Sequence, residues 1–95
     1  MAHPRVVHCN RASYDVYIGR PSKWGNPFVL GRDGTRKQVI ERYEHWLHDQ
    51  PQLLADLHEL AGKTLGCWCA PRACHGDVLA RLADELVDAK RIKQP

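Results

Sequence analysis

Residues 67–77 concentrate side chains that can do chemistry: three thiols, an imidazole, a guanidinium and a carboxylate within eleven positions. Cys74 is expected at the start of the last helix, where unpaired main-chain N–H groups lower the pKa of a thiol and attract anions. His75 can act as an acid or a base, and the planar fork of Arg72 can hold a phosphate or a carboxylate. The segment therefore predicts a nucleophile site, with Cys74, His75 and Asp77 as candidate catalytic residues and Arg72 as a ligand contact.

Two other interpretations of the same segment stay open. Zinc could be held by Cys67, Cys69, Cys74 and His75, but a Cys-x-Cys pair followed by adjacent Cys and His does not match the spacing of structural zinc sites. We therefore expect no metal and no cofactor. In the other interpretation the first two cysteines are small core residues, while His75 and Asp77 cap the helix.

Residues 10–28 interleave aromatic side chains with arginine and lysine. Aromatic faces stack on bases and basic side chains pair with phosphate, so a nucleotide or a nucleic-acid strand is the expected partner. The alternative is that the aromatic side chains only anchor this segment to the core. The candidate ligand contacts are Asn10, Arg11, Arg20, Trp24 and Asn26.

The charges are unevenly distributed along a chain whose net charge is +3. Residues 1–37 carry seven basic and two acidic side chains, whereas residues 38–89 carry four basic and nine acidic ones. A basic N-terminal third attracts phosphate-bearing ligands, but the acidic remainder argues against a general DNA-coating protein. Residues 90–95 add a basic C-terminal tail.

Hydrophobic periodicity predicts the elements that position these residues. Segments rich in β-branched and aromatic residues indicate strands at 5–9, 14–18 and 63–69. A loop rich in glycine and proline follows the second strand, over residues 19–34. Helical spacing predicts a helix over 35–49 that begins with a capping box, a second from Pro51 to a stop at Gly62, and a third from about Cys74 to Ala89.

This order of elements favours a small single-domain α/β sandwich over residues 1–89. A strand that returns after helices usually does so by a crossover, so the short sheet should be largely parallel and flanked by about three helices. Both chemical segments then follow strands, and ligand sites gather at the carboxyl ends of parallel strands. The fold therefore predicts one cleft between residues 10–28 and 67–77.

Length and composition exclude several classes of protein. Ninety-five residues, of which 43% are hydrophobic and 26% charged, are typical of one globular domain. No apolar run approaches the roughly 18–20 residues that span a bilayer, and the first residues lack the apolar core of a signal peptide. We therefore expect a cytoplasmic protein without a membrane partner, whose four cysteines do not form a disulfide framework.

Two paired motifs resemble a known family. Ile18-Gly19-Arg20 followed by residues 24–28 (WGNPF), together with residues 67–71 (CWCAP) followed by residues 74–77 (CHGD), is similar to the bacterial and phage family called domain of unknown function 4326. The resemblance covers residues 6–84 and implies an intracellular, phage-related protein of no established activity. The Cys-His element also resembles the start of the last helix in domain of unknown function 488, where an arginine occupies the position of Gly76.

These observations converge on a small phage-related domain that binds or processes a nucleotide, a nucleoside or nucleic acid in the predicted cleft. The alternatives are a non-enzymatic module that modulates a host protein and a small zinc-stabilised domain. The cleft hypothesis would be excluded if Trp24 or Asn26 lay far from His75, on the opposite side of the domain.

Overall fold

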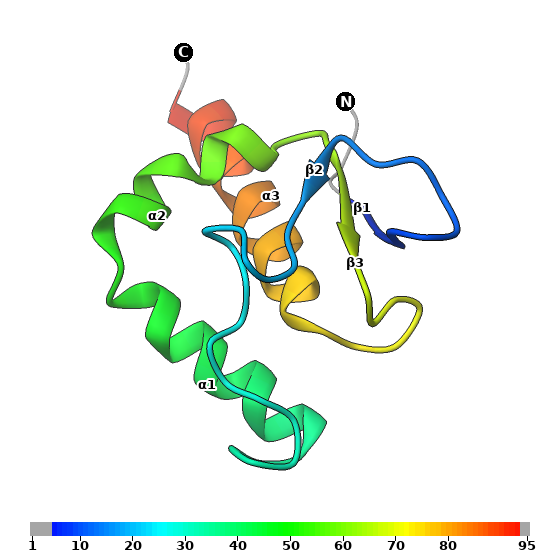
Figure 1. Cartoon of the computed structure of the whole chain (residues 1–95). Coiled ribbons are helices and arrows are strands. Elements are labelled where there is room, and N and C mark those ends of the chain that lie inside the picture. The colour runs from blue at the N-terminus through cyan, green and yellow to red at the C-terminus, as the bar shows by residue number, and fades with distance from the viewer. Residues whose placement is uncertain (1–4, 94–95) are drawn as a thin grey trace.

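Three short strands form a parallel sheet in the computed structural model, which describes the backbone of residues 5–93 and the side chains of residues 5–86 (Figure 1). The central strand is β3 (Thr64–Cys67), flanked by β1 (Arg5–His8) and β2 (Val16–Tyr17). Both edge strands run parallel to β3. The predicted α/β fold with a short parallel sheet is confirmed.

The strands are shorter than the sequence predicted, most of all β2. Asp15 precedes it and pairs with Thr64 partly through its side chain: Oδ2 accepts from the Thr64 N–H at 2.9 Å, while the Asp15 N–H donates to the Thr64 carbonyl at 2.8 Å. The Tyr14 ring packs over Gly66, where an added Cβ would lie 2.6 Å from the ring. Side-chain contacts thus replace strand pairing at the start of the predicted segment.

Helix α1 (Arg36–His48) begins at the predicted capping box. The Gln38 N–H donates to Thr35 Oγ1 at 3.2 Å, and the Thr35 N–H donates to Gln38 Oε1 at 2.9 Å. Its buried face consists of Val39, Tyr43 and Leu47. The capping box therefore identified the start of this helix, and the 3.6-residue periodicity identified the face that packs inward.

The predicted second helix is divided into two types of helix. Proline starts α2 (Pro51–Asp56), and the chain then tightens into the 3-10 helix η1 (Leu57–Leu60). Gly62 follows with a φ of +71°, a left-handed conformation that glycine adopts at low cost. The predicted stop at this glycine is confirmed.

Helix α3 (His75–Lys93) begins one residue after the predicted start and continues beyond Ala89. Its helical backbone includes residues 90–93 of the expected basic tail, and residues 94–95 lie outside the described residues. The described part of the chain contains no helix that is both long and apolar enough to cross a membrane.

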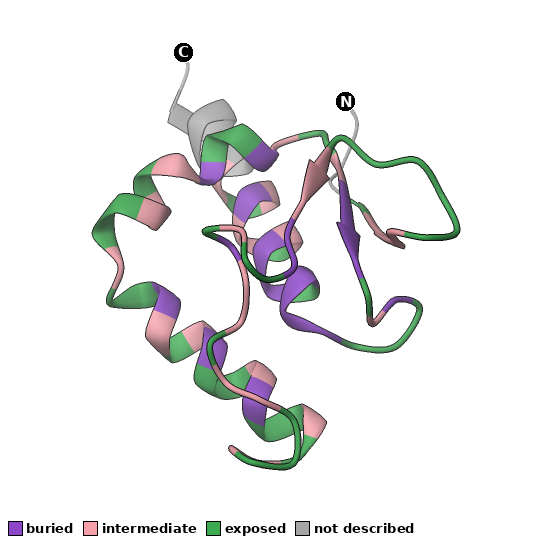
Figure 2. Ribbon diagram, viewed as in Figure 1, coloured by how far each residue is buried: buried purple, intermediate pink, exposed green. Residues whose placement is uncertain are grey.

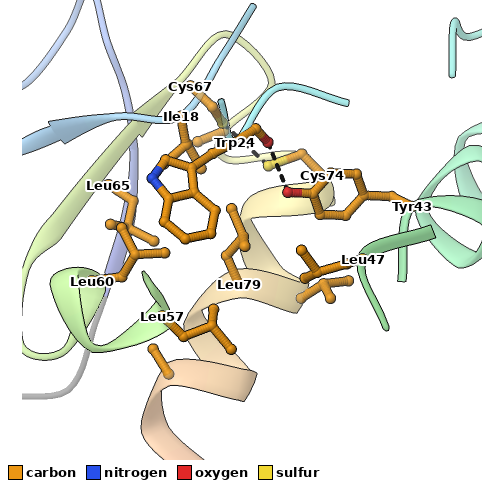
Figure 3. Close-up of a cluster of buried hydrophobic side chains, with 13 residues drawn as sticks. Ile18, Trp24, Tyr43, Leu47, Leu57, Leu60, Leu65, Cys67, Cys74 and Leu79 are labelled. Atoms are coloured by element: carbon orange, nitrogen blue, oxygen red, sulfur yellow. Dashed lines mark hydrogen bonds between the residues drawn. The ribbon is translucent and has the colours of Figure 1, made fainter. Parts of the chain in front are cut away.

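The core lies where α3 meets the sheet and the other helices. α3 contacts β1 and β3 as well as α1 and η1, so it is the central helix of the domain (Figure 1). Buried positions follow the inner faces of these elements in Figure 2. Ile18, Leu65 and Leu79 are fully buried at the centre of the cluster drawn in Figure 3. The carboxyl ends of β2 and β3 open on to the loops that carry the two chemical segments.

Candidate functional site

The two chemical segments meet at one cavity of about 160 Å³, called the inner cavity below. Its walls come from the loop after β2, the chain after β3 and the first turns of α1. Asn26 and His75 both line it, so the juxtaposition that the cleft hypothesis requires is present. The lining residues are Gly19, Arg20, Asn26, Phe28, Leu30, Arg36, Val39, Ile40, Cys67, Trp68, Cys69, Ala73, Cys74 and His75.

A second, more open space of about 430 Å³, the outer hollow, adjoins the inner cavity. The two spaces share Arg36, Trp68 and Cys69 as walls. The remaining walls of the outer hollow are His8, Arg11, Ala70, Pro71 and Arg72. Because they share these walls, the two spaces are together called the continuous site, which lies at the carboxyl edge of the sheet, where parallel α/β folds bind ligands.

Four arginines line this continuous site, and no aspartate or glutamate does among the described residues. Arg20 faces the inner cavity, Arg11 and Arg72 face the outer hollow, and Arg36 borders both. Arg36 is half-buried, and its Nη1 donates to the carbonyl of Ala73 at 3.1 Å, which fixes its position. A concave surface lined by one sign of charge concentrates ligands of the opposite sign.

Trp68 stands at the junction of the two spaces with 57% of its surface exposed. Its indole N–H donates to the Tyr17 hydroxyl at 2.8 Å, and its ring meets His8 edge to face at a centroid distance of 5.7 Å. These contacts hold an exposed aromatic face in place. Trp68 is not among the sequence-predicted site residues, although it follows the buried Cys67 at the end of β3, where the next side chain of an extended chain points to the opposite face.

Trp24 occupies the core rather than the site. Only 2% of it is exposed, and its carbonyl accepts the hydroxyl of the buried Tyr43 at 2.7 Å (Figure 3). Neighbouring Lys23 pairs with Asp56 and Glu59 at 2.9 Å each, which ties the loop to α2 and η1. The structure therefore favours the anchoring alternative for Trp24 and leaves it no free face for a ligand.

Asn26 and Asn10 both make local contacts. Asn26 Oδ1 accepts from the Phe28 N–H at 2.9 Å and its Nδ2 donates to the Val39 carbonyl at 3.2 Å, so its amide joins the loop to α1. The exposed Asn10 lines neither space, and its main-chain N–H donates to His8 Nδ1 at 3.1 Å. Of this pair, only Asn26 borders the site, with both ends of its amide already engaged.

Cys74 and Asp77 cap the start of α3. The Cys74 N–H donates to Asp77 Oδ2 at 3.1 Å, and the Gly76 N–H donates to Cys74 Sγ at 3.3 Å, an arrangement like a capping box with a thiol as the cap. Asp77 lines neither space, which supports its alternative role as a cap. A Cβ at Gly76 would lie 2.7 Å from Ile18 Cδ1, so the arginine of domain of unknown function 488 does not fit there.

His75 is buried with 8% exposure, and its Nε2 lies 2.7 Å from the carbonyl oxygen of Ile18. A carbonyl can only accept, so Nε2 carries the proton and Nδ1 keeps the lone pair of a neutral imidazole. Burial lowers the pKa of His75, and the nearby Arg20 acts in the same direction. The ring is therefore a neutral group with one nitrogen available as a base.

Cys67 and Cys74 are the most unusual pair in the site. Both are free thiols with 1% and 3% exposure, and their sulfurs lie 3.2 Å apart (Figure 3). The Cys74 thiol and the main-chain N–H groups of Ala70 and Cys69 lower the pKa of the Cys67 thiol to about 6. Contact with Cys67 and burial raise the pKa of Cys74. The sequence alone predicts the activated thiol at Cys74, whereas the main-chain contacts in the structure favour the thiolate on Cys67.

The residues proposed as zinc ligands do not converge. Within the described part of the chain, no group of three or more histidine, cysteine, aspartate or glutamate side chains is placed to hold a metal ion. The Nε2 of His75 is already bonded to Ile18. The zinc-stabilised alternative therefore gains no support from the geometry.

The fold and the site define a small α/β domain with a cationic site at the carboxyl edge of a three-stranded parallel sheet. The chain belongs to the family described as a domain of unknown function, DUF4326, whose profile matches residues 4–85. The resemblance noted in the sequence is thereby confirmed, because the matched range contains both paired motifs.

Two uncharacterised viral proteins are similar to this chain. The "uncharacterized 12.4 kDa protein in nrdA-td intergenic region" of Enterobacteria phage T4 is 36% identical over 87 residues, covering 86% of this chain and 79% of the relative. The "uncharacterized protein R718" of Acanthamoeba polyphaga mimivirus is 37% identical over 86 residues, covering 72% of this chain and 65% of the relative. No solved structure matches. The protein is thus related to phage and giant-virus proteins.

Proposed function

We propose that the chain binds a mononucleotide in the continuous site formed by the inner cavity and the outer hollow. The observation that carries this proposal is the set of four arginines, without a carboxylate among the described lining residues, around an exposed tryptophan. Phosphate is the anion that guanidinium groups bind best through paired hydrogen bonds, and an aromatic face suits a planar base.

The phosphate end of the ligand fits the outer hollow. Arg36 is held at its floor by the Ala73 carbonyl, while Arg11 and Arg72 are exposed and free to close on an anion. Charge-assisted hydrogen bonds from a fixed guanidinium are stronger than neutral ones. A volume of about 430 Å³ lies within the roughly 300–1,000 Å³ typical of small-molecule sites.

The ring end of the ligand fits the junction at Trp68 and the inner cavity. That cavity is walled by apolar side chains, including Phe28, Val39 and Ile40. At about 160 Å³ it is smaller than the roughly 300 Å³ at the lower end of whole-ligand sites, so it holds one part of the ligand. Trp68 supplies a stacking face beside its entrance.

A mononucleotide suits the chain better than a nucleic-acid strand. Residues 38–89 carry nine acidic and four basic side chains, so the positive surface does not extend along the molecule as a polymer track would require. Of the predicted catalytic residues, Cys74 and His75 line the inner cavity and Asp77 does not. We therefore propose binding as the function and assign no reaction on the bound nucleotide.

Titration of the full chain with mononucleotides, the matching nucleosides and short single-stranded oligonucleotides tests the proposal by calorimetry. We expect mononucleotides to bind, nucleosides to bind weakly, and Arg36→Ala and Arg72→Ala each to reduce mononucleotide affinity by about tenfold, roughly 1.4 kcal/mol. Arg42→Ala is the matched control, since Arg42 is an exposed arginine of α1 that lines neither space. Equal affinity for nucleoside and nucleotide, or preferential binding of oligonucleotides, would contradict the proposal.

A further inference from the structure

The thiols of Cys67 and Cys74 have a geometry that nucleotide binding does not use. Cys67 ends β3 and Cys74 directly precedes α3, and the six residues between them return the chain so that the two sulfurs lie 3.2 Å apart inside the core. A disulfide bond is about 2.05 Å long, so the sulfurs must approach by only about 1 Å to form one. Both residues also line the inner cavity, which gives a small reagent a route to them.

We propose that Cys67 and Cys74 form a dithiol site that reduces a small peroxide and closes to a disulfide, with Cys67 as the attacking thiol and Cys74 as the resolving thiol. This inference rests on the sulfur geometry and does not depend on nucleotide binding.

The contacts of the two sulfurs assign their roles. Either sulfur can donate across the 3.2 Å contact, and the main-chain N–H groups of Ala70 and Cys69 favour the anion on Cys67. Contact with Cys67 and burial raise the pKa of Cys74, which favours the proton on that sulfur. A thiolate attacks a peroxide oxygen, whereas a protonated thiol does not. Cys67 therefore reacts first, and Cys74 lies beside it as the resolving thiol.

The chemistry balances in two steps. The Cys67 thiolate attacks one oxygen of hydrogen peroxide, the O–O bond breaks, and sulfenic acid forms with release of hydroxide. The Cys74 sulfur then attacks the Cys67 sulfur, the S–O bond breaks, and the hydroxyl leaves as water with the Cys74 proton. Two thiols are oxidised to one disulfide while one peroxide is reduced to two waters. A small thiol reductant reverses the closure by exchange, becoming a disulfide itself.

The burial of Cys67 and Cys74 limits the size of the oxidant that can reach their sulfurs. The two side chains are 1% and 3% exposed, and the cavity that reaches them measures about 160 Å³. Hydrogen peroxide fits such a space, whereas a peptide disulfide does not reach the sulfurs without opening the core. Cys9 and Cys69 are half-buried and serve as internal controls for unselective oxidation.

Closure also has a local consequence at α3. Cys74 Sγ accepts from the Gly76 N–H at 3.3 Å, and it moves toward Cys67 when the disulfide forms. The end of β3 is held by the Cys9 N–H, which donates to the Cys67 carbonyl at 2.9 Å. The movement therefore falls mainly on the Cys74 side chain, within the cap of the helix.

To test this, the reduced full chain is treated with one equivalent of hydrogen peroxide at pH 6. The products are digested without reducing their disulfides, and the peptides are mapped by mass spectrometry. We expect the free thiols to fall from four to two and a single peptide pair to be linked through Cys67 and Cys74. The lowered pKa of the Cys67 thiol leaves more thiolate at this pH than a free peptide thiol of pKa ~8.5 has, so Cys67 should react faster than that peptide thiol.

Two variants separate attack from resolution. In Cys74→Ser the sulfenic acid cannot resolve, and dimedone should trap it at Cys67; serine is a favoured helix cap, so this variant should fold. Cys9→Ser is the control and should still form the same linked pair. First oxidation at Cys9 or Cys69, a Cys67–Cys69 link, or a rate no higher than that of the free peptide thiol would overturn the proposal. The peptide map of the chain without substitutions shows which two cysteines are linked, even if a variant misfolds.

Discussion

His75 Nε2 lies 2.7 Å from the main-chain oxygen of Ile18, and this bond joins the start of α3 to the end of β2. It connects the two chemical segments, because Ile18 leads into the loop that carries Asn26 and His75 follows the segment that carries the thiols. The ring also meets the buried Tyr43 edge to face, with centroids 5.0 Å apart. His75 is thus a positioning residue for both walls of the inner cavity.

Folding stability should fall at acid pH through His75. Because burial lowers its folded pKa, the unfolded chain takes up this proton first, near pH 6.5. The stability contributed by neutral His75 is therefore complete above about pH 6.5 and is lost as the pH falls toward the folded pKa. His75→Gln keeps an N–H donor for Ile18 without the titration.

The measurement is urea unfolding of both proteins at pH 7.5 and pH 5.5. Both chains have the same carboxylates, so the difference between their free energies of unfolding reports on His75. We expect the original chain to be the more stable at pH 7.5 and the gap to narrow at pH 5.5. A gap that stays constant with pH would show that this imidazole does not titrate as its burial requires.

Gly76→Ala should destabilise the chain although alanine favours helices. Alanine gains up to about 1 kcal/mol of helix propensity over glycine. The new Cβ would lie 2.7 Å from Ile18 Cδ1 and 3.1 Å from Val6 Cγ1, so these side chains or α3 must shift within the packed core. Overpacking of this kind costs roughly 1–3 kcal/mol, and the net loss should appear as a lower melting temperature.

Lys37→Ala, at an exposed position of α1, is the control for Gly76→Ala and should change stability by no more than about 0.5 kcal/mol. A higher melting temperature for Gly76→Ala than for the original chain would mean that α3 does not approach β1 and the Ile18 segment this closely.

Local patterns predicted the elements well because each depends on neighbours in the sequence. The Thr35–Gln38 cap, the Val39–Tyr43–Leu47 face and the stop at Gly62 are all set within a few residues. The end of α3 was misjudged, since basic residues after Ala89 suit a helix C-terminus as well as a tail.

The site was predicted less completely because its details depend on contacts between distant segments. Trp24 and Trp68 sit in similar motifs, yet the first packs in the core and the second stands exposed. Burial of Trp24 depends on Tyr43, nineteen positions away, which donates to its carbonyl. Arg36 of α1 also lines the inner cavity, and the capping box around it predicts a helix start but no ligand contact.

Nucleotide binding should weaken with salt in proportion to the phosphate charge. Arg11 and Arg72 are exposed, so their attraction to an anion is screened once the Debye length falls from about 10 Å at 0.1 M to about 3 Å at 1 M. We expect affinity for a nucleoside diphosphate to drop roughly three- to tenfold over this range, and affinity for the monophosphate to drop less. Calorimetry at both salt concentrations measures this, and identical affinities would place the phosphates away from the arginines.

Alkylation at mildly acidic pH should mark Cys67 before Cys74. The sequence alone favoured Cys74, on the argument that the start of α3 stabilises a thiolate. In the structure the two sulfurs lie 3.2 Å apart, and the main-chain donors around Cys67 lower its pKa, while contact with Cys67 and burial raise the pKa of Cys74.

Access does not distinguish the two thiols, because they are 1% and 3% exposed and line the same cavity. A short pulse of iodoacetamide at pH 6.5 should therefore modify Cys67 at least about tenfold more than Cys74, since the labelled fraction follows the thiolate fraction. Peptide mass spectrometry after quenching gives the ratio directly. Equal labelling would mean that the shared proton has no preferred sulfur, and faster labelling of Cys74 would restore the helix start as the source of activation.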